Sequence, residues 1–369
     1  MIEDKYFRCF VLTLFIIFSL LQGKGLSSGT SRQQESGEKQ RSLSLFPILM
    51  YDSDIGFGFG GKGILKNQFH RNESFDLILF ASTKGEQWYV FTFSIPDFEI
   101  RQGSAYPFAV DVRFSFDKLL KSNFFGFGNT SMNNDWQFPR EMSKLELTIG
   151  RGFTHQFITE AGLVANYSSV YGYRGVNPLM HPGIPGEGEN LISYFWLGLR
   201  LDSRDSQIHP RGGWRVWLKS DFAGKFAGSD FAYQRYRLEV SNYRQLFGPA
   251  HIFAWRLWAQ QVDGTAPYYE QSIIGGGWTA RGFKADRFIE NAMILSSAEY
   301  RLQFIKRLGA VVFVDTGRVF PDMRKASFKR WKADVGFGLR YYLANFVVRF
   351  DSGFSNEGTR IFFNFGHVF

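Results

Sequence analysis

Apolar and polar residues alternate with a period of two over segments of about ten residues, and this pattern most constrains the fold. Residues 144–150 read KLELTIG, which puts two leucines and an isoleucine on one face of an extended segment and lysine, glutamate and threonine on the other. Strict alternation marks a strand with one apolar and one polar face. Soluble strands average about 5–6 residues, whereas a tilted strand that crosses a bilayer needs about 9–11. The same pattern recurs in residues 108–116, 194–202, 234–241 and 334–342.

The polar faces of these segments carry both lysine or arginine and aspartate or glutamate. A basic side chain turned to mid-bilayer lipid costs about 2–4 kcal/mol, so the charged faces are expected to line a wet, ion-paired lumen. We count sixteen such segments, an even number as in single-chain bacterial barrels, and closure leaves no unpaired edge in lipid. They begin near residues 44, 55, 75, 87, 108, 142, 157, 191, 213, 231, 250, 291, 308, 332, 345 and 360. The prediction is an all-β, 16-stranded antiparallel transmembrane β-barrel in outer-membrane lipid.

Connection lengths give an independent check on the strand count. The long connections, residues 117–141, 169–190, 263–290 and 320–331, all follow odd-numbered segments. Short connections follow even-numbered ones, and a miscounted strand would destroy this order. Outer-membrane barrels have short periplasmic turns and longer external loops, so both ends of the barrel domain are expected on the periplasmic side.

The first residues have the three-part organisation of a secretory leader. Lys5 and Arg8 precede an apolar run over residues 9–21, and small residues follow it. The run is short for a membrane-spanning helix, so we expect residues 1–29 to be a removed signal peptide; a permanent anchor helix is the alternative. Residues 30–43 are polar and are expected to be a disordered spacer before the barrel over 44–369. Cys9, the only cysteine in the sequence, would leave with the leader.

Little in the sequence indicates catalysis, metal binding or nucleic-acid binding. None of the six histidines has another at metal-ligand spacing, and no G-x-S-x-G nucleophile motif occurs. Residues 56–61 read GFGFGG but lie in an alternating segment without the helix of a dinucleotide site. The net charge of +9 is not gathered into a basic stripe, which disfavours nucleic acid. We therefore expect no enzyme activity, no cofactor and no metal.

Five stretches together point to one family. They are FFGFGN (124–129), LDSRDSQIHPRGG (201–213), IGGGWTARGF (274–283), FVDTG (313–317) and FNFGHVF (363–369). Jointly they resemble the bacterial surface antigen family of BamA/TamA-type outer-membrane barrels. The resemblance implies a role in inserting or translocating proteins or lipids at the outer membrane. In that family a weak seam between the first and last strands and the inner loop matter more than any chemistry. The resemblance leaves open whether a periplasmic partner protein takes part.

The resemblance also implies that loop 263–290, which carries Arg281, Gly282 and Phe283, folds back into the lumen and that Arg281 reaches an acidic wall residue. The residues support a partner independently. Phe313, Asp315 and Gly317 share one strand face, and Asp315 cannot face lipid cheaply. The planar guanidinium of arginine suits a carboxylate, so we expect Arg281 to pair with Asp315.

Other pairings remain open. Glu299 and Asp351 lie on expected lumen faces and are fallback partners of Arg281. Alternatively, Arg281 lies in a solvated loop and Asp315 pairs with a neighbour such as Arg340.

Residues 363–369 resemble the closing-strand signal that the barrel assembly machinery reads. The signal residues would be Phe363, Phe365, Gly366 and Phe369, and His367 is expected in the same terminal strand. One departure from the family is that residues 30–43 leave no room for a periplasmic POTRA domain, which puts client capture by such domains in doubt. The competing functions are a passive diffusion channel or structural surface antigen, and a barrel hydrolase, which the missing catalytic motifs disfavour.

Overall fold

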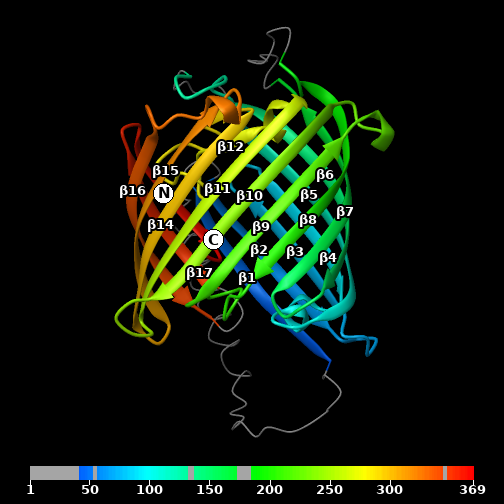
Figure 1. Cartoon of the computed structure of the whole chain (residues 1–369), viewed down its shortest axis with the longest axis vertical. Helices are drawn as coiled ribbons and strands as arrows, with labels where there is room; N and C mark the ends of the chain where they lie inside the picture. Colours follow the sequence, from blue (N-terminus) through cyan, green and yellow to red (C-terminus); the bar gives the residue numbers. More distant parts are fainter. Residues whose placement is uncertain (1–40, 53–55, 132–136, 173–183, 344–346) are drawn as a thin grey trace, which may run out of the picture. The chain divides into compact units, whose positions relative to one another are not determined.

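The computed structural model describes residues 41–52, 56–131, 137–172, 184–343 and 347–369. Within them, sixteen strands form one antiparallel sheet closed into a barrel (Figure 1). These strands are β1 (Ser42–Asp52), β2 (Gly56–Lys66), β3 (Ser74–Ser82), β4 (Gln87–Ile95), β5 (Tyr106–Asn123), β6 (Gln137–Gly152), β7 (Phe157–Val170), β8 (Gly188–Asp202), β9 (Gly213–Ala223), β10 (Ala232–Gln245), β11 (His251–Thr265), β14 (Ala292–Ile305), β15 (Leu308–Phe320), β16 (Lys332–Tyr342), β17 (Val347–Ser355) and β18 (Gly358–Phe365). The predicted 16-stranded antiparallel barrel is therefore confirmed. Residues 1–29 and most of 30–43, the expected leader and spacer, lie outside the described residues.

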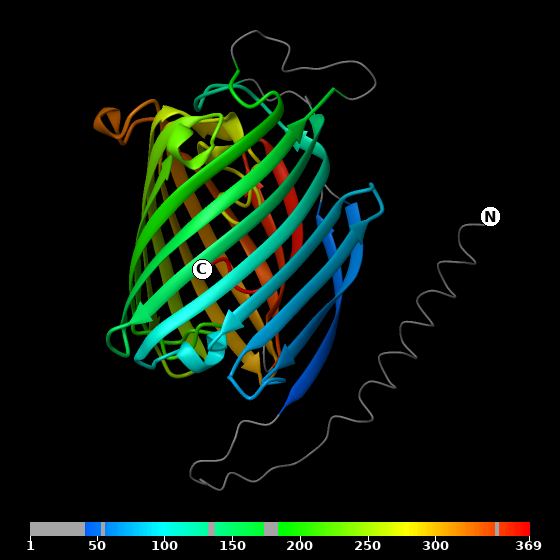
Figure 2. The same ribbon diagram turned by 90° about the vertical axis from the view of Figure 1, so that its right-hand side faces the viewer.

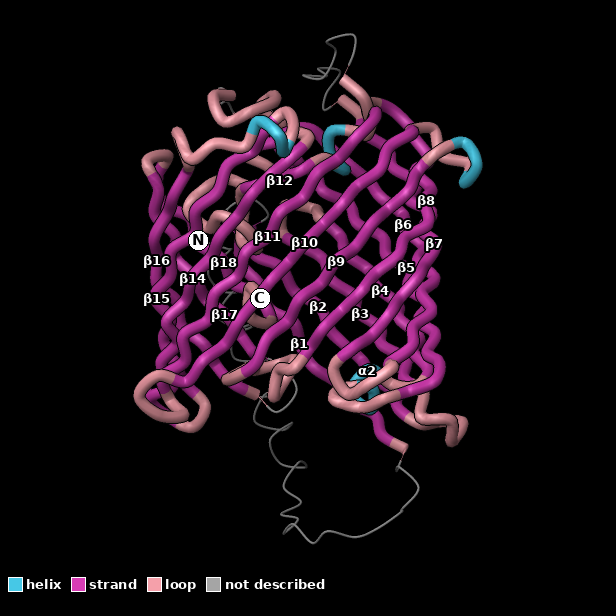
Figure 3. The backbone as a smooth tube through the Cα atoms, in the orientation of Figure 1, coloured by secondary structure: helices cyan, strands magenta, loops and turns pink. Residues whose placement is uncertain are grey.

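Short elements occupy the ends of the barrel and its interior (Figure 3). The four are α2 (Phe98–Arg101), η1 (Lys225–Ala227), η2 (Tyr268–Glu270) and η3 (Met323–Lys325). A separate two-stranded sheet joins β12 (Ser272–Ile274) to β13 (Phe288–Glu290). In the described part of the chain, no helix is long and apolar enough to cross a membrane.

The strand faces separate as the alternation predicts. Leu145, Leu147 and Ile149 on β6 are exposed on the outer wall, where lipid would cover them. Charged side chains on the inner faces form ion pairs across neighbouring strands, as between Arg200 and Glu160 at 2.8 Å. The sorting follows from the cost of placing a charge in lipid.

Strands β5 and β6 extend further than the sequence pattern indicated. Pairing continues to Ser122↔Phe138 and Asn123↔Gln137, so the connection expected over 117–141 shortens to 124–136. Lys118 and Glu141 face each other in register and form an ion pair at 2.7 Å. Two charges that read as loop residues in the sequence therefore become paired wall residues.

The barrel closes through a short seam. Among the described residues, β1 and β18 pair at Tyr51↔Phe363 and Asp52↔Phe362, whereas β1 and β2 pair along eleven residues. Figure 2 shows the first strands, in blue, at one side of the wall. The seam is thus the place where neighbouring strands of the wall share the fewest residue pairs among the described residues.

The expectation that residues 363–369 form one continuous strand is wrong for the last four. Strand β18 ends at Phe365, and Gly366 adopts the left-handed conformation, with a φ of +80°. The segment that follows, Gly366–Phe369, which we call the tail, turns into the barrel, where both views place it (Figures 1 and 2). Val368 and Phe369 are buried against Tyr243 of β10 and Ala254 of β11. His367 accordingly belongs to the tail and not to the strand.

Candidate functional site

The connection between β11 and β14 enters the lumen and fills part of it. Its hairpin β12–β13 pairs Ile273 with Ile289 and holds the tip, residues 275–287, against the inner wall. The apolar contacts of this lumen loop join Ile274, Ala280, Phe283 and Phe288 to wall residues Met293, Leu295 and Val319. The lumen loop is therefore held against the wall by an apolar cluster, in addition to the ion pairs described next.

Arg281 lies at the tip and is completely buried. Its Nε donates to Asp315 Oδ2 at 2.7 Å and its Nη2 to Asp315 Oδ1 at 3.0 Å, a two-pronged pair with one carboxylate. The guanidinium also lies over the ring of Phe313, with its central carbon 3.4 Å from the ring centroid. Planar stacking and forked donation both require arginine and not lysine.

Glu299 and Asp351, the fallback partners expected from the sequence, bind Arg281 in addition to Asp315. Nη1 of Arg281 donates to Glu299 at 2.6 Å and to Asp351 at 3.3 Å. Arg340, the alternative neighbour for Asp315, instead donates to Asp351 at 2.6 Å. The resulting lock network joins the fully buried side chains of Arg281, Arg301, Arg340, Arg349, Glu299, Asp315 and Asp351.

The lumen loop lies close to the wall around this network. The residues that allow this are Gly282, Gly317 and Phe283, the last through its packing in the apolar cluster. A Cβ on Gly282 would lie 2.5 Å from Asp334 Cβ, and the Gly282 carbonyl accepts a hydrogen bond from Ser355 Oγ at 2.7 Å. A Cβ on Gly317 would lie 2.9 Å from the Ile274 side chain. Both glycines therefore permit close approach of the loop to the wall.

Loop 124–131 joins the lumen loop, which sequence reasoning did not foresee. Phe127 forms a parallel bridge with Ile289 of β13. Asn129 donates to the Val319 carbonyl at 2.6 Å and accepts from the Val319 amide at 3.1 Å, in place of a neighbouring strand. The FFGFGN stretch was the only sign of this contact in the sequence. It was expected to lie in a loop, but its binding to the lumen loop and to β15 was not expected.

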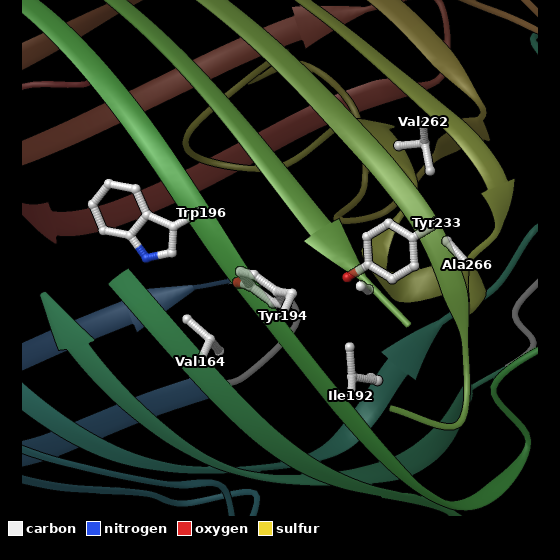
Figure 4. Close-up of a cluster of buried hydrophobic side chains, with 8 residues drawn as sticks. Val164, Ile192, Tyr194, Trp196, Tyr233, Val262 and Ala266 are labelled. Atoms are coloured by element: carbon white, nitrogen blue, oxygen red, sulfur yellow. The ribbon is translucent and has the colours of Figure 1, made fainter. Parts of the chain in front are cut away.

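Buried aromatic residues from several strands also lie inside the barrel. Tyr194 and Trp196 of β8 and Tyr233 of β10 are buried together with small apolar side chains (Figure 4). A neighbouring cluster joins Phe138 and Tyr268 to the FFGFGN loop. Together with the two loops, these clusters fill part of the barrel interior.

Two arginines of the inner wall hold the tail. Arg256 donates to the Val368 carbonyl at 3.3 Å, and Arg301 donates to the Phe369 carbonyl at 3.1 Å. The guanidiniums of both lie over the Phe369 ring, at 5.0 and 5.4 Å from its centroid. Arg256 also donates to the Trp278 carbonyl of the lumen loop at 2.9 Å, so one side chain binds both inserted segments.

The turn after β8 follows the D-x-R-D pattern and contacts the tail. Arg204 binds both carboxylate oxygens of Asp202, at 2.8 and 2.7 Å, and Asp205 accepts from the amides of Arg211 and Gly212. This rigid turn presents His209, whose Nδ1 is 3.1 Å from His367 Nε2.

This histidine contact, outside the spanning strands, predicts a loss of stability in acid. Burial, together with Arg211 and Arg301, lowers the pKa of His209 to about 4, and burial lowers the pKa of His367 well below 6.5. The unfolded chain therefore takes up protons as pH falls from about 6.5 towards 4 while the folded state does not, which favours unfolding. We expect the temperature of the shift to unfolded gel mobility to fall between pH 7.5 and pH 5, and less so in His209→Gln. The exposed control His155→Gln should keep the full pH dependence, and an equal dependence in His209→Gln would contradict the prediction.

Comparisons with known proteins agree with this geometry. A family model described as the Omp85 superfamily domain matches residues 67–369. The chain therefore belongs to the Omp85 superfamily, whose barrels insert or translocate other molecules at the outer membrane, and it is an integral outer-membrane protein. No curated protein matches the chain significantly.

Solved structures show the same fold at low sequence identity. BamA from Haemophilus ducreyi lacking POTRA domains 1–3 is 15% identical with a TM-score of 0.63, over 89% of this chain and 70% of that one. CdiB from Escherichia coli is 12% identical with a TM-score of 0.63, over 87% and 62%. CdiB from Acinetobacter baumannii is 13% identical with a TM-score of 0.59, over 88% and 59%. This chain thus spans about three fifths of the CdiB chains.

Proposed function

We propose that this protein assists the insertion or translocation of protein or lipid clients at the outer membrane, with the β1–β18 seam as the point of exchange. The observation that carries the proposal is the seam itself, two residue pairs against eight between β17 and β18 within the described residues. A client strand could pair with an edge that the barrel leaves largely unpaired, as in other β-augmentation complexes.

The position of the tail supports this role. Gly366 donates to the Val347 carbonyl at 2.7 Å, and the segment beyond it follows the inner wall. It therefore does not extend the pairing of β18 with β1. Backbone groups without partners in lipid cost several kcal/mol each, so such an edge is a favourable place for a client strand.

A disulfide across the seam tests the proposal. In a Cys9→Ser background, Tyr51→Cys and Phe363→Cys replace register partners of β1 and β18. We expect the protein with an unmodified seam, reconstituted in vesicles, to accelerate the folding of an eight-stranded client barrel. The oxidised double-cysteine variant should lose that acceleration. Reduction should restore it.

The matched control places the pair within a fully paired wall, at Phe350→Cys and Phe363→Cys, which are register partners of β17 and β18. This disulfide should leave the acceleration intact. Equal activity of the oxidised and reduced seam variants, or no acceleration by the unmodified protein, would reject the proposal.

A passive diffusion channel is the competing function. The lumen loop, loop 124–131 and the tail all occupy the barrel interior. Low single-channel conductance of the purified protein would agree with an insertion or translocation role, whereas a large and stable open pore would favour passive diffusion.

A further inference from the structure

A basic pocket lies at the long-loop end of β15 and β16, separate from the lock network and from the seam. Its volume is about 630 Å³. It is formed where loop 124–131, the connection 321–331 and the turn between β17 and β18 meet. The lining residues are Asn129, Thr130, Arg318, Arg330, Trp331, Lys332, Ala333 and Asn356.

Three of the lining residues are cations and none is acidic. Within the described residues, Arg318, Arg330 and Lys332 form no salt bridge. Arg318 donates through Nη1 to Ser327 Oγ at 3.3 Å and to the Lys329 carbonyl, while its Nε is buried without a hydrogen-bond partner. Lys332 Nζ lies 5.1 Å from the Phe288 ring centroid. Three residues with positively charged side chains line this concave site and no acidic residue does, so the site favours an anion.

The connection is held in a defined conformation around these cations. Arg330 has a φ of +57°, which residues other than glycine rarely adopt. Trp331 Nε1 donates to the Ser327 carbonyl at 2.8 Å, and the Phe328 ring stacks on Trp331 at 5.9 Å. The pocket is therefore shaped by a folded turn.

The pocket lies at the edge of the barrel wall. Arg318 follows the outward register of Val312 and Val314, which are exposed on the outer wall, whereas Asp315 on the opposite face is buried in the lumen. Phe328 is 93% exposed beside it. An arginine and exposed aromatic residues at the end of an outward-facing strand are typical of the membrane–water interface.

We propose that this pocket binds a phosphorylated glucosamine, the headgroup chemistry of lipid A in the outer leaflet. The exposed guanidinium of Arg330 can bind phosphate oxygens with two parallel N–H donors, and the exposed side chains of Thr130 and Asn356 can bond to sugar hydroxyls. The volume lies within the range of small-molecule sites. The same chemistry occurs in a free sugar phosphate, which the experiment distinguishes. The inference goes beyond the proposed insertion role and does not depend on it.

The test is calorimetric titration of the detergent-solubilised full chain with three probes: diphosphoryl lipid A, the same lipid after phosphatase treatment, and glucosamine 1-phosphate. We expect diphosphoryl lipid A to bind and its dephosphorylated form to bind at least about tenfold more weakly, the effect of losing a charge-assisted contact. Binding of glucosamine 1-phosphate at similar affinity would identify the headgroup as sufficient. Binding of diphosphoryl lipid A without binding of glucosamine 1-phosphate would show that the ligand is the membrane lipid and not a free sugar phosphate.

The variant Arg318→Gln/Arg330→Gln/Lys332→Gln should lose the binding. The matched control Arg324→Gln/Lys325→Gln/Lys329→Gln removes three cations from the same connection outside the lining of the pocket and should keep it. Arg330→Gln alone, at an exposed side chain, provides a change with little risk to folding. No binding of either phosphorylated probe, equal binding of the dephosphorylated lipid, or equal losses in both triple variants would overturn the proposal.

Discussion

Arg281→Ala is expected to release the lumen loop and destabilise the barrel by about 3–5 kcal/mol, the cost of breaking a buried ion pair. Arg281 donates three hydrogen bonds to the Asp315 carboxylate, and no other cation pairs with this carboxylate in the described part of the chain. In contrast, Glu299 keeps Arg301 and Asp351 keeps Arg340. Asp315 also faces Asp334 in register. The variant would therefore leave two neighbouring carboxylates without this cation. The expected readouts are a higher single-channel conductance and a lower temperature for the shift to unfolded gel mobility.

A double-mutant cycle separates this pairing from general loss of packing. Asp315→Ala should have the same two effects, and the double variant should cost less than the sum because each change removes the same interaction. Arg324→Ala is a suitable control, since Arg324 is 90% exposed and pairs with Asp322 outside the lumen. Strictly additive effects of Arg281→Ala and Asp315→Ala, or equal loss in the control, would refute the lock.

Replacing Phe363 and Phe365 with aspartate is expected to abolish assembly into the outer membrane. Both side chains share the outward register of β18, and their rings contact edge to face at 6.4 Å. A charge on the lipid face disfavours insertion, and the strand that the assembly machinery is expected to read would lose its aromatic pattern. We expect the folded, surface-exposed protein to disappear and unfolded protein to collect in the periplasm, measured by surface protease accessibility and gel mobility.

The control for this variant is Phe328→Asp, which makes the same change at an exposed loop residue. It should assemble normally. Undiminished surface exposure of Phe363→Asp/Phe365→Asp would show that these two residues are not required as a closing-strand signal. The position of Phe369 beside Arg256 and Arg301 would then be a structural feature of the finished barrel only.

The strand pattern of the sequence was sufficient to predict the wall. Which residues face lipid follows from alternation within a single segment, because a charge on the lipid face is costly wherever the strand lies in the barrel. For the same reason Asp315 could be assigned to the lumen before its partner was known. The boundary errors fall where pairing with a neighbour extends a strand, as in the Lys118–Glu141 pair.

Contacts between segments distant along the chain were decided by the tertiary structure alone. The sequence offered Asp315, Glu299 and Asp351 as alternatives for Arg281, and the register of β14, β15 and β17 brings all three to one guanidinium. The inward turn of the tail likewise depends on Arg256 and Arg301 of strands that precede it by more than sixty residues. Alternation reports only which face of its own strand a residue occupies. The distance across a lumen depends on how all the strands close, and no local pattern contains that information.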